Sequence, residues 1–536
     1  MPEYAQSGVT HRDGAAARAR QNWAILSVAA LCNMALLWLA SHAGSAIVMV
    51  AAAGLFAFSN NTLFALMHEA VHGNFDPAPR RNEMGGWLTA AFFPTAFTLQ
   101  RSAHLTHHRN NRSELERFDY IGPDESIPLK TGQWFSILTG LYWLGIPAFL
   151  AFFTLFAELV PWRRLNRKHH GFSRQTSAGE FLKSLISLPR WRVRAEFLAS
   201  LAWQAAMAWA LDLSLAGWSA CYGAFALAWS SLQYADHAFS SLDRIEGAWN
   251  LSVGGFTRRM FLNYHCHLEH HRDRDCPWQG LPLRMQAERD PPRRFLSVLL
   301  LMWQGPRLLP GSGQGSARQR LLDGWVIAAH ILVFGAVFQL VYGLSSLDFV
   351  SRQALFDLAL PIDARAPFVP GAALIYLSIT PLLLVTGLVL GEPRRTLPVL
   401  GALVFQVVVG GLCFVLFPVM PPVPPPVDPA TLAGRLFALA DTINLAGNCM
   451  PSLHVALALS CGWAAGTVLR GPRRAAMWVW SLAICLSTWL TWQHWLLDIV
   501  GGAALAAVGM GVIAPWLARE RARIAAALIG PEPASG

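Results

Sequence analysis

Long apolar stretches separated by short polar loops dominate this chain. A helix that crosses a membrane needs about 20 mostly apolar residues. The first half offers two hairpins of such stretches, at 23–40 with 46–67 and at 197–211 with 215–232. The second half offers six more, at 325–342, 371–390, 397–417, 452–469, 477–492 and 495–517. This pattern predicts an all-α polytopic membrane protein with about ten spans.

One segment between the two halves breaks the apolar pattern. Residues 305–322 are rich in Gly, Pro, Ser and Arg, a composition typical of a linker. We therefore predict two membrane domains, 1–304 and 323–536, joined by a linker at 305–322.

Composition agrees with a membrane protein and excludes several other classes. Hydrophobic residues make up 54% of the chain and charged residues 14%, with a mean hydropathy of +0.36. The net charge of +10 would suggest nucleic-acid binding in a soluble protein, but here Lys and Arg lie in short loops between apolar stretches. That distribution indicates membrane topology and contact with anionic lipid, and no nucleic-acid partner. The eight cysteines form no C-x-x-C pair, so neither a zinc ribbon nor a disulfide scaffold is predicted.

Histidines gather in three clusters, each beside an apolar segment. H-x-x-H-H spacing occurs twice, and a shorter cluster has two histidines at i and i+4, so that on a helix each cluster shares one face. The clusters are His68 with His72; His104, His107 and His108; and His267, His270 and His271. Neutral imidazole suits transition metals, and eight histidines exceed what one tetrahedral ion can use, so two metal ions are indicated.

The loop charges predict where these clusters lie. The basic N-terminus places the start of the chain in the cytoplasm, so each hairpin returns to that side. We expect all three clusters, together with His237 after the second hairpin, to meet on the cytoplasmic face of the membrane.

The three clusters and the hairpins between them resemble the histidine boxes of the membrane fatty acid desaturase and hydroxylase superfamily, over residues 20–300. The resemblance implies two non-haem iron ions that use molecular oxygen to remove hydrogen from an acyl chain. It makes Asn263 and His265 candidates for a supporting role around the metals. The ligands it implies are His68, His72, His104, His107, His108, His237, His267, His270 and His271.

No haem-attachment or dinucleotide motif occurs in the sequence, so a separate electron-donor protein of ferredoxin or cytochrome type is expected. One alternative is an intramembrane zinc metalloprotease, because His68-Glu69-Ala70-Val71-His72 also fits H-E-x-x-H. That alternative leaves the other two clusters unexplained. A second alternative is a lipid phosphotransferase or phosphatase whose histidine clusters are a vestigial metal site.

The second half carries two further motifs at predicted external boundaries. His494 and Asp498 stand at i and i+4, so the carboxylate can hold one ring nitrogen and make the other more nucleophilic. His454, in Pro451-Ser452-Leu453-His454, can then serve as a general acid or base.

These motifs resemble the phosphatidic acid phosphatase type 2 superfamily, and most of all its inositol phosphorylceramide synthase branch. The resemblance implies a six-helix bundle with His494 as the nucleophile that forms a phosphohistidine, Asp498 as its orienting group and His454 as the acid and base. The sequence departs from the family where Thr488 replaces an arginine that would clamp phosphate. Hydrolysis and phosphotransfer therefore both stay open.

Together these observations predict a bifunctional, lipid-modifying membrane enzyme. Its two sites are expected on opposite faces of the membrane, which excludes direct transfer of a headgroup between them. We expect a bacterial inner membrane as its location.

Overall fold

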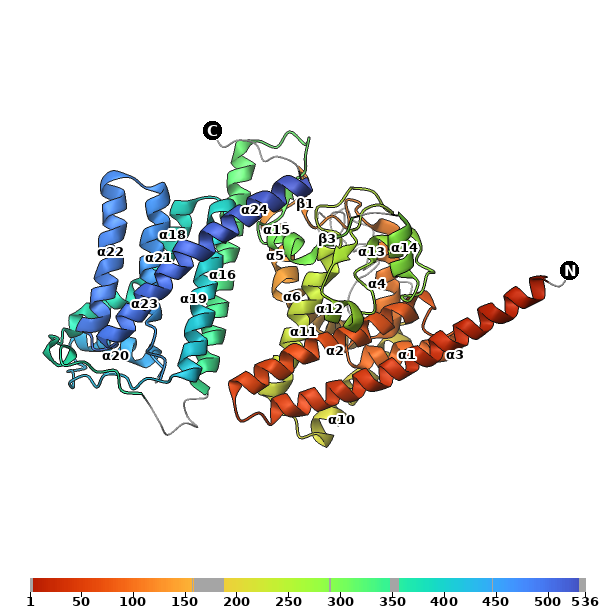
Figure 1. The fold of residues 1–536 in the computed structure, drawn as a ribbon, viewed down its shortest axis with the longest axis horizontal. Coiled ribbons are helices and arrows are strands. Elements are labelled where there is room, and N and C mark those ends of the chain that lie inside the picture. Colours follow the sequence, from red (N-terminus) through yellow and green to blue (C-terminus); the bar gives the residue numbers. More distant parts are fainter. Residues whose placement is uncertain are drawn as a thin grey trace. The chain divides into compact units, whose positions relative to one another are not determined.

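The computed structural model describes residues 3–156, 158, 188–288, 291–347, 356–445 and 447–529. Almost every regular element in these ranges is a helix (Figure 1). The chain separates into two compact units. The N-terminal unit comprises residues 1–43, 47–302 and 306–312, and the C-terminal unit comprises residues 44–46, 303–305 and 313–536.

The N-terminal unit is helical apart from two pairs of very short parallel strands, β1 with β4 and β2 with β3. Its elements are α1 (Glu3–Ser41), α2 (Ala46–His72), α3 (Pro79–Ala91), α4 (Phe97–Asn110), β1 (Tyr120–Ile121), α5 (Ile127–Thr139), α6 (Leu141–Phe156), α10 (Arg190–Ala210), α11 (Leu215–Ala235), β2 (Leu251–Ser252), α12 (Gly255–Met260), α13 (His267–Arg272), α14 (Leu281–Glu288), β3 (Arg293–Arg294), α15 (Phe295–Met302) and β4 (Arg307–Leu308).

The C-terminal unit is a bundle of longer helices. Its elements are α16 (Ser316–Leu347), η2 (Asp363–Arg365), η3 (Pro370–Ala372), α17 (Ala373–Leu377), α18 (Ile379–Leu390), α19 (Pro393–Leu416), α20 (Leu432–Ile443), α21 (Leu453–Val468), α22 (Gly471–Leu490), α23 (Leu496–Val508), the π-helical turn η4 (Gly509–Ile513) and α24 (Ala514–Ile529). Helix α16 begins inside the predicted linker, because its first two turns already lie at 316–322.

Helices form at all ten predicted stretches, but fewer are long and apolar enough to cross a membrane. Within the described ranges six helices meet both conditions, or seven if the bent pair α5 and α6 counts as one span. The predicted hairpin of α10 and α11 is not among them. Its helices bury polar side chains such as Gln204 and Ser230, which lower their hydropathy while pointing into the protein.

A sharp bend joins α5 to α6. The two helix axes meet at 102°, and the connecting Gly140 has a φ of +81°. A β-carbon at this position would lie 2.8 Å from the backbone nitrogen of Leu227 in α11. Glycine is therefore required both by the left-handed backbone and by the close approach of α11.

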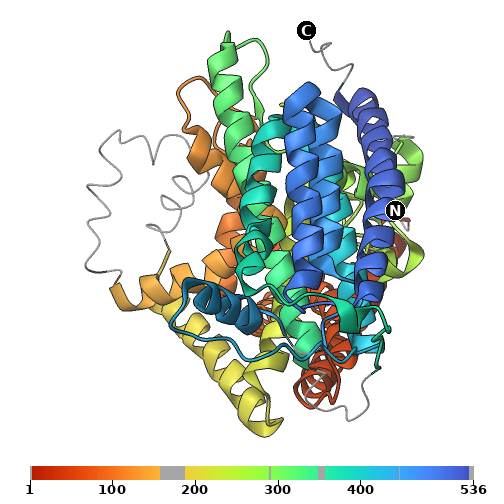
Figure 2. The same cartoon turned by 90° about the vertical axis from the view of Figure 1, so that its left-hand side faces the viewer.

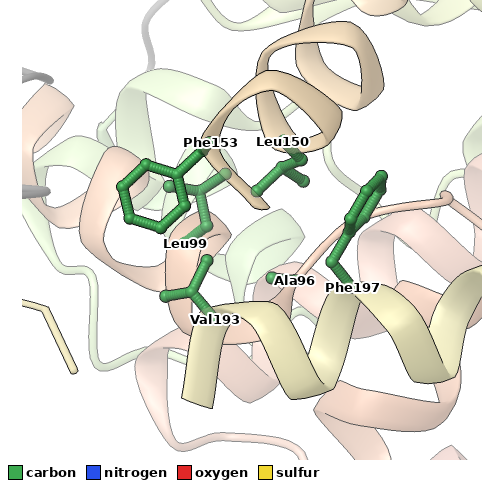
Figure 3. Close-up of a cluster of buried hydrophobic side chains, with 6 residues drawn as sticks. All are labelled: Ala96, Leu99, Leu150, Phe153, Val193 and Phe197. Atoms are coloured by element: carbon green, nitrogen blue, oxygen red, sulfur yellow. The ribbon is translucent and has the colours of Figure 1, made fainter. Parts of the chain in front are cut away.

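A buried apolar cluster fixes the helix that carries the second histidine motif. Leu99 of α4 packs with side chains from α6 and α10, and all six members are almost fully buried (Figure 3). The members are Ala96, Leu99, Leu150, Phe153, Val193 and Phe197. This packing fixes the first turn of α4, one to two turns before its histidines.

In the C-terminal unit, α21 is the central helix. It runs beside α22 (Figure 2), and its buried Ala458, Cys461 and Ala465 pack against Leu382 of α18 and Ile484 of α22. The small side chains let these helices approach closely, as is common where helices meet inside membranes. Helix α21 thereby holds its first turn, which contains His454, in a fixed place.

Candidate functional site

The nine histidines predicted as metal ligands converge in one place in the N-terminal unit. They come from four elements that are far apart in sequence: the end of α2, helix α4, the turn after α11 and helix α13. Their ligand atoms form two groups, and in each group all ligand atoms lie within 4.8 Å of one another. The first group is His68, His72, His104 and His270, and the second is His107, His237, His267 and His271.

His108 completes the set of nine. Its Nε2 lies 3.0 Å from Nε2 of His104 and 3.0 Å from Nε2 of His270, both members of the first group. Its ring centroid is also 4.5 Å from that of His271, a member of the second group. His108 therefore belongs with the first group and touches the second.

The spacing of the nitrogens fits shared metal ions. Two nitrogens bound to one ion at about 2.1 Å lie roughly 3.0 to 3.4 Å apart for the usual ligand angles. His237 and His267 reproduce this separation in the second group, with 3.0 Å between their Nε2 atoms. The Nε2 atoms of His68, His72 and His271 are buried and have no hydrogen-bond partner among the described residues. A metal ion would satisfy these lone pairs, so the residues present fit two metal ions.

Neighbouring groups orient two of the rings in the second group. Nδ1 of His237 lies 2.8 Å from the carbonyl oxygen of Gly247, which fixes Nδ1 as the donor and leaves the Nε2 lone pair for a metal. Nδ1 of His107 lies 3.5 Å from a carboxylate oxygen of Glu116. Histidines that bind metals commonly donate their second nitrogen to a carbonyl or carboxylate in this way.

Burial favours the neutral form of His104 and His108 in α4 and of the histidines in α13. Loss of solvation, together with the neighbouring imidazoles, lowers the pKa of His108 to about 2. The same two causes hold the pKa values of His104, His267 and His270 well below the usual value. Neutral imidazole is the form that binds metal, so the lone pairs are available at neutral pH.

A buried ion pair ties the end of α4 to the segment that carries His237. Both nitrogens at the end of Arg112 donate to Asp119, at 2.8 and 2.9 Å, and neither side chain is accessible to solvent. The hydroxyl of Tyr234 donates to the same carboxylate at 2.8 Å, and the backbone N–H of Phe239 donates to it at 2.7 Å. The network therefore spans the chain on both sides of His237.

A cavity of about 490 Å³ opens against both histidine groups. His68 and His104 of the first group line it, as do His107, His237 and His267 of the second. Its remaining wall is mainly apolar and comes from α2, α4, α5, α6 and α11, with Phe64, Leu99, Leu141, Ile146, Phe149 and Trp229 among its members. The cavity has room for a long apolar ligand beside five of the nine imidazoles, with members of both groups among them.

The three residues predicted for the second site also come together, in the C-terminal unit. Nδ1 of His494 lies 3.4 Å from a carboxylate oxygen of Asp498. The ring centroids of His454 and His494 are 6.4 Å apart, and His454 stacks on Tyr376 with a centroid distance of 3.9 Å. Asp498 accepts the backbone N–H of Trp495 at 2.9 Å, which holds its carboxylate toward the histidine.

Comparison with known families gives one match in each half of the chain. Residues 43–295 match the family model of fatty acid desaturases, and residues 358–512 match that of the PAP2 superfamily. The chain joins a fatty acid desaturase domain to a PAP2 superfamily domain. It is thus a two-domain membrane enzyme of lipid metabolism, which confirms the two predicted superfamilies and the all-α fold; the match does not extend to the inositol phosphorylceramide synthase branch. Searches of curated proteins and of solved structures returned no match.

Sequence reasoning missed one acidic residue in the desaturase domain. Asp236 directly precedes His237, and its carboxylate oxygens lie 3.8 Å from Nε2 of His237 and 3.5 Å from Nε2 of His267. The side chain is 1% exposed, and neither oxygen has a hydrogen-bond partner among the described residues. A buried carboxylate without such partners is costly unless a cation lies nearby, so Asp236 belongs with the second group.

The other candidate residues of the desaturase domain, Asn263, His265 and Glu69, contact protein groups other than the nine histidines. Asn263 donates to the carbonyl of Trp278 at 3.1 Å, and Nε2 of His265 contacts the sulfur of Cys266 at 3.6 Å. Among the described residues, neither side chain hydrogen bonds to one of the nine histidines. Glu69 accepts the backbone N–H of Trp278 at 3.2 Å.

In the PAP2 domain, Thr488 supplies no charge to a phosphate. Its hydroxyl donates to the carbonyl of Cys485 at 2.7 Å, and the side chain is fully buried.

Sequence reasoning also missed Cys449, whose sulfur lies within 4.8 Å of ligand atoms of His494 and Asp498. Its place just before Pro451-Ser452 in the sequence is the signal that could have found it.

Proposed function

We propose that the desaturase domain carries out oxygen-dependent desaturation or hydroxylation of a fatty acyl chain at a di-iron site. The observation that carries this proposal is the contact of two four-histidine groups with one mainly apolar cavity. When bound, two non-haem irons would supply the activation of molecular oxygen that an unactivated C–H bond requires.

The chain itself has three tasks in this reaction. The nine histidines would hold the metals, and Asp236 would offset part of their charge. The apolar side chains of the cavity would hold the acyl chain and keep water away from the reacting carbon. Electrons would come from a separate protein of ferredoxin or cytochrome type.

Metal content of the purified full-length protein tests this proposal. We expect about two irons per chain, with a clear loss in the His270→Ala variant, because His270 is one of the four ligands of the first group and its Nε2 lies 3.0 Å from Nε2 of His108. The exposed His42 lies outside both groups, so His42→Ala is the matched control and should keep its iron. A host that makes the active protein should also show altered acyl chains that the His270→Ala host lacks.

Other metal contents would favour the alternatives. A single zinc, with loss of function in Glu69→Gln, would support the intramembrane protease. Metal without any oxygen-dependent lipid product would support a vestigial metal domain. Either result would contradict the oxidoreductase proposal.

For the PAP2 domain we propose hydrolysis or transfer of a lipid phosphate through a phosphohistidine on His494. The contact between Asp498 and Nδ1 of His494 supports this role, since it leaves Nε2 as the nucleophile. Nε2 would bond to phosphorus as the bond from phosphorus to the leaving oxygen breaks, and His454 would protonate that oxygen. Water or an alcohol, losing its proton to His454, would then take the phosphoryl group from His494.

Trapping of the phosphoenzyme tests the second activity. Acid quenching is avoided because phosphohistidine is acid-labile, so we propose an alkaline quench after incubation with a lipid labelled at phosphorus. The wild-type chain should be labelled and His494→Ala should not be. His454→Ala should gain label more slowly and also lose it more slowly, because His454 serves both steps. Label on His494→Ala, or unchanged rates in His454→Ala, would contradict the assigned roles.

The domain boundaries and the membrane in which the protein resides are also proposals. We propose membrane domains at 1–304 and 323–536 with a linker at 305–322, in a bacterial inner membrane.

A further inference from the structure

A pocket of about 230 Å³ opens beside His494 in the PAP2 domain. Three tryptophans line it, Trp489, Trp492 and Trp495, and all three are half-buried. Most of the other lining residues are apolar, and the described lining contains no lysine or arginine. The volume equals that of roughly seven or eight water molecules, enough for a small headgroup.

The indole N–H groups of this pocket are already committed to the protein. Trp489 donates to Asp363 at 3.0 Å, Trp492 to the carbonyl of Ala366 at 3.3 Å, and Trp495 to the carbonyl of Met420 at 2.7 Å. The rings therefore offer carbon surfaces to a ligand, and no free indole donor. A headgroup rich in hydroxyls would leave its own hydrogen-bonding groups unpaired there.

A carboxylate adds negative charge to the same pocket. Asp363 lines the pocket and is 5% exposed. Its oxygens accept the indole N–H of Trp489 and the backbone N–H groups of Leu496 and Leu360, so the carboxylate is held in place in the pocket wall. Aromatic faces next to a fixed carboxylate attract a cation, and a quaternary ammonium needs no hydrogen bonds.

We propose that this pocket binds a quaternary ammonium headgroup of the choline type, so that the PAP2 domain acts on phosphocholine lipids. The proposal rests on the proposed function of His494. It also gives a reason for the missing arginine at Thr488, because a zwitterionic phosphocholine carries its own cation beside the phosphate.

The position of the headgroup then determines which bond to phosphorus breaks. Nε2 of His494 bonds to phosphorus, the bond from phosphorus to the oxygen of the lipid backbone breaks, and His454 protonates that oxygen. The phosphocholine unit stays on His494 with its ammonium among the tryptophans. Water or an acceptor alcohol then takes the unit and gives its proton to His454.

Calorimetric binding to the full-length protein, in a detergent without choline groups, tests the pocket. The probes are phosphocholine, inositol phosphate, and an analogue of phosphocholine in which a neutral tert-butyl group replaces the trimethylammonium group. We expect phosphocholine to bind more tightly than both, and Trp492→Leu to weaken it roughly five- to thirtyfold. Trp492→Phe, which keeps an aromatic face, should lose less. Trp463 is 41% exposed and lies outside the pocket, so Trp463→Leu is the matched control and should bind normally.

Two outcomes would overturn the inference: equal binding of the isostere, or inositol phosphate binding that is as tight as that of phosphocholine. The His494→Ala variant separates this inference from the proposed function. Phosphocholine binding that depends on Trp492, without any phosphoenzyme, would contradict the role of His494 and support the headgroup pocket. A phosphoenzyme that forms equally from choline and inositol lipids would contradict the proposed choline pocket and leave the role of His494 supported.

Discussion

Replacing Arg112 with leucine would break the buried network that spans His237. The substitution leaves the carboxylate of Asp119 in a fully buried site with two of its four hydrogen bonds, those from Tyr234 and from the backbone of Phe239. Removal of one partner from a buried ion pair costs about 3–5 kcal/mol, because a charge is left without compensation. Arg112→Leu should therefore destabilise the N-terminal unit by about that amount.

Thermal unfolding in detergent, followed together with iron content, measures the effect. A loss of this size corresponds to a fall of roughly 10 °C in the unfolding midpoint for a unit of this length. Iron should also be lost on mild heating, because the network fixes the end of α4 and the turn with His237.

The matched control is Arg81→Leu. Arg81 forms one ion pair with Asp76 at 3.2 Å, and its side chain is 60% exposed, so its removal should cost about 1 kcal/mol or less. If Arg112→Leu and Arg81→Leu lower the midpoint equally, the buried pair does not stabilise the site and the reasoning is refuted.

Three further predictions follow from the desaturase domain. Asp236→Ala should retain less iron than wild type in a chelator challenge, while His42→Ala retains it fully; equal retention would exclude a role for the carboxylate. A side chain added at Gly145 would meet open space in the cavity wall, so Gly145→Leu should shift lipid products toward shorter acyl chains with iron content unchanged, as measured by mass spectrometry. Gly140→Ala should destabilise the unit by about 2 kcal/mol or more in the same unfolding assay, since it combines a left-handed backbone with a clash against α11.

Spacing along the sequence predicted the helices and the histidine faces because both depend on local geometry. The assignment of each histidine to a group was not predictable in this way. Within α4, His104 lies in the first group and His107 in the second, and α13 divides its histidines similarly. Which group a ring joins depends on the angle at which the helices cross, and that angle is set by long-range packing such as the cluster around Leu99.

The tryptophan pocket could be predicted from the sequence only in part. The tryptophans at 489, 492 and 495 repeat every three residues, a spacing that could have been noticed. The hydrogen bonds of their indoles to Asp363, Ala366 and Met420 join distant segments, and no local pattern encodes them. Ten spans were predicted, whereas six helices, or seven with the bent pair, have the length and hydropathy of a span among the described residues. The apolar stretches were chosen by sequence alone, which does not show where a helix ends or which of its polar side chains are buried.

The division of α4 and α13 between the two histidine groups links the two metal positions. Any ion that orders His104 and His270 in the first group also fixes the backbone that carries His107 and His267 in the second. The second ion then meets ligands that are already ordered and loses less conformational entropy on binding. Loading of this centre should consequently be cooperative, with singly occupied protein scarce during assembly, so that a domain that has captured one ion is committed to completing the pair.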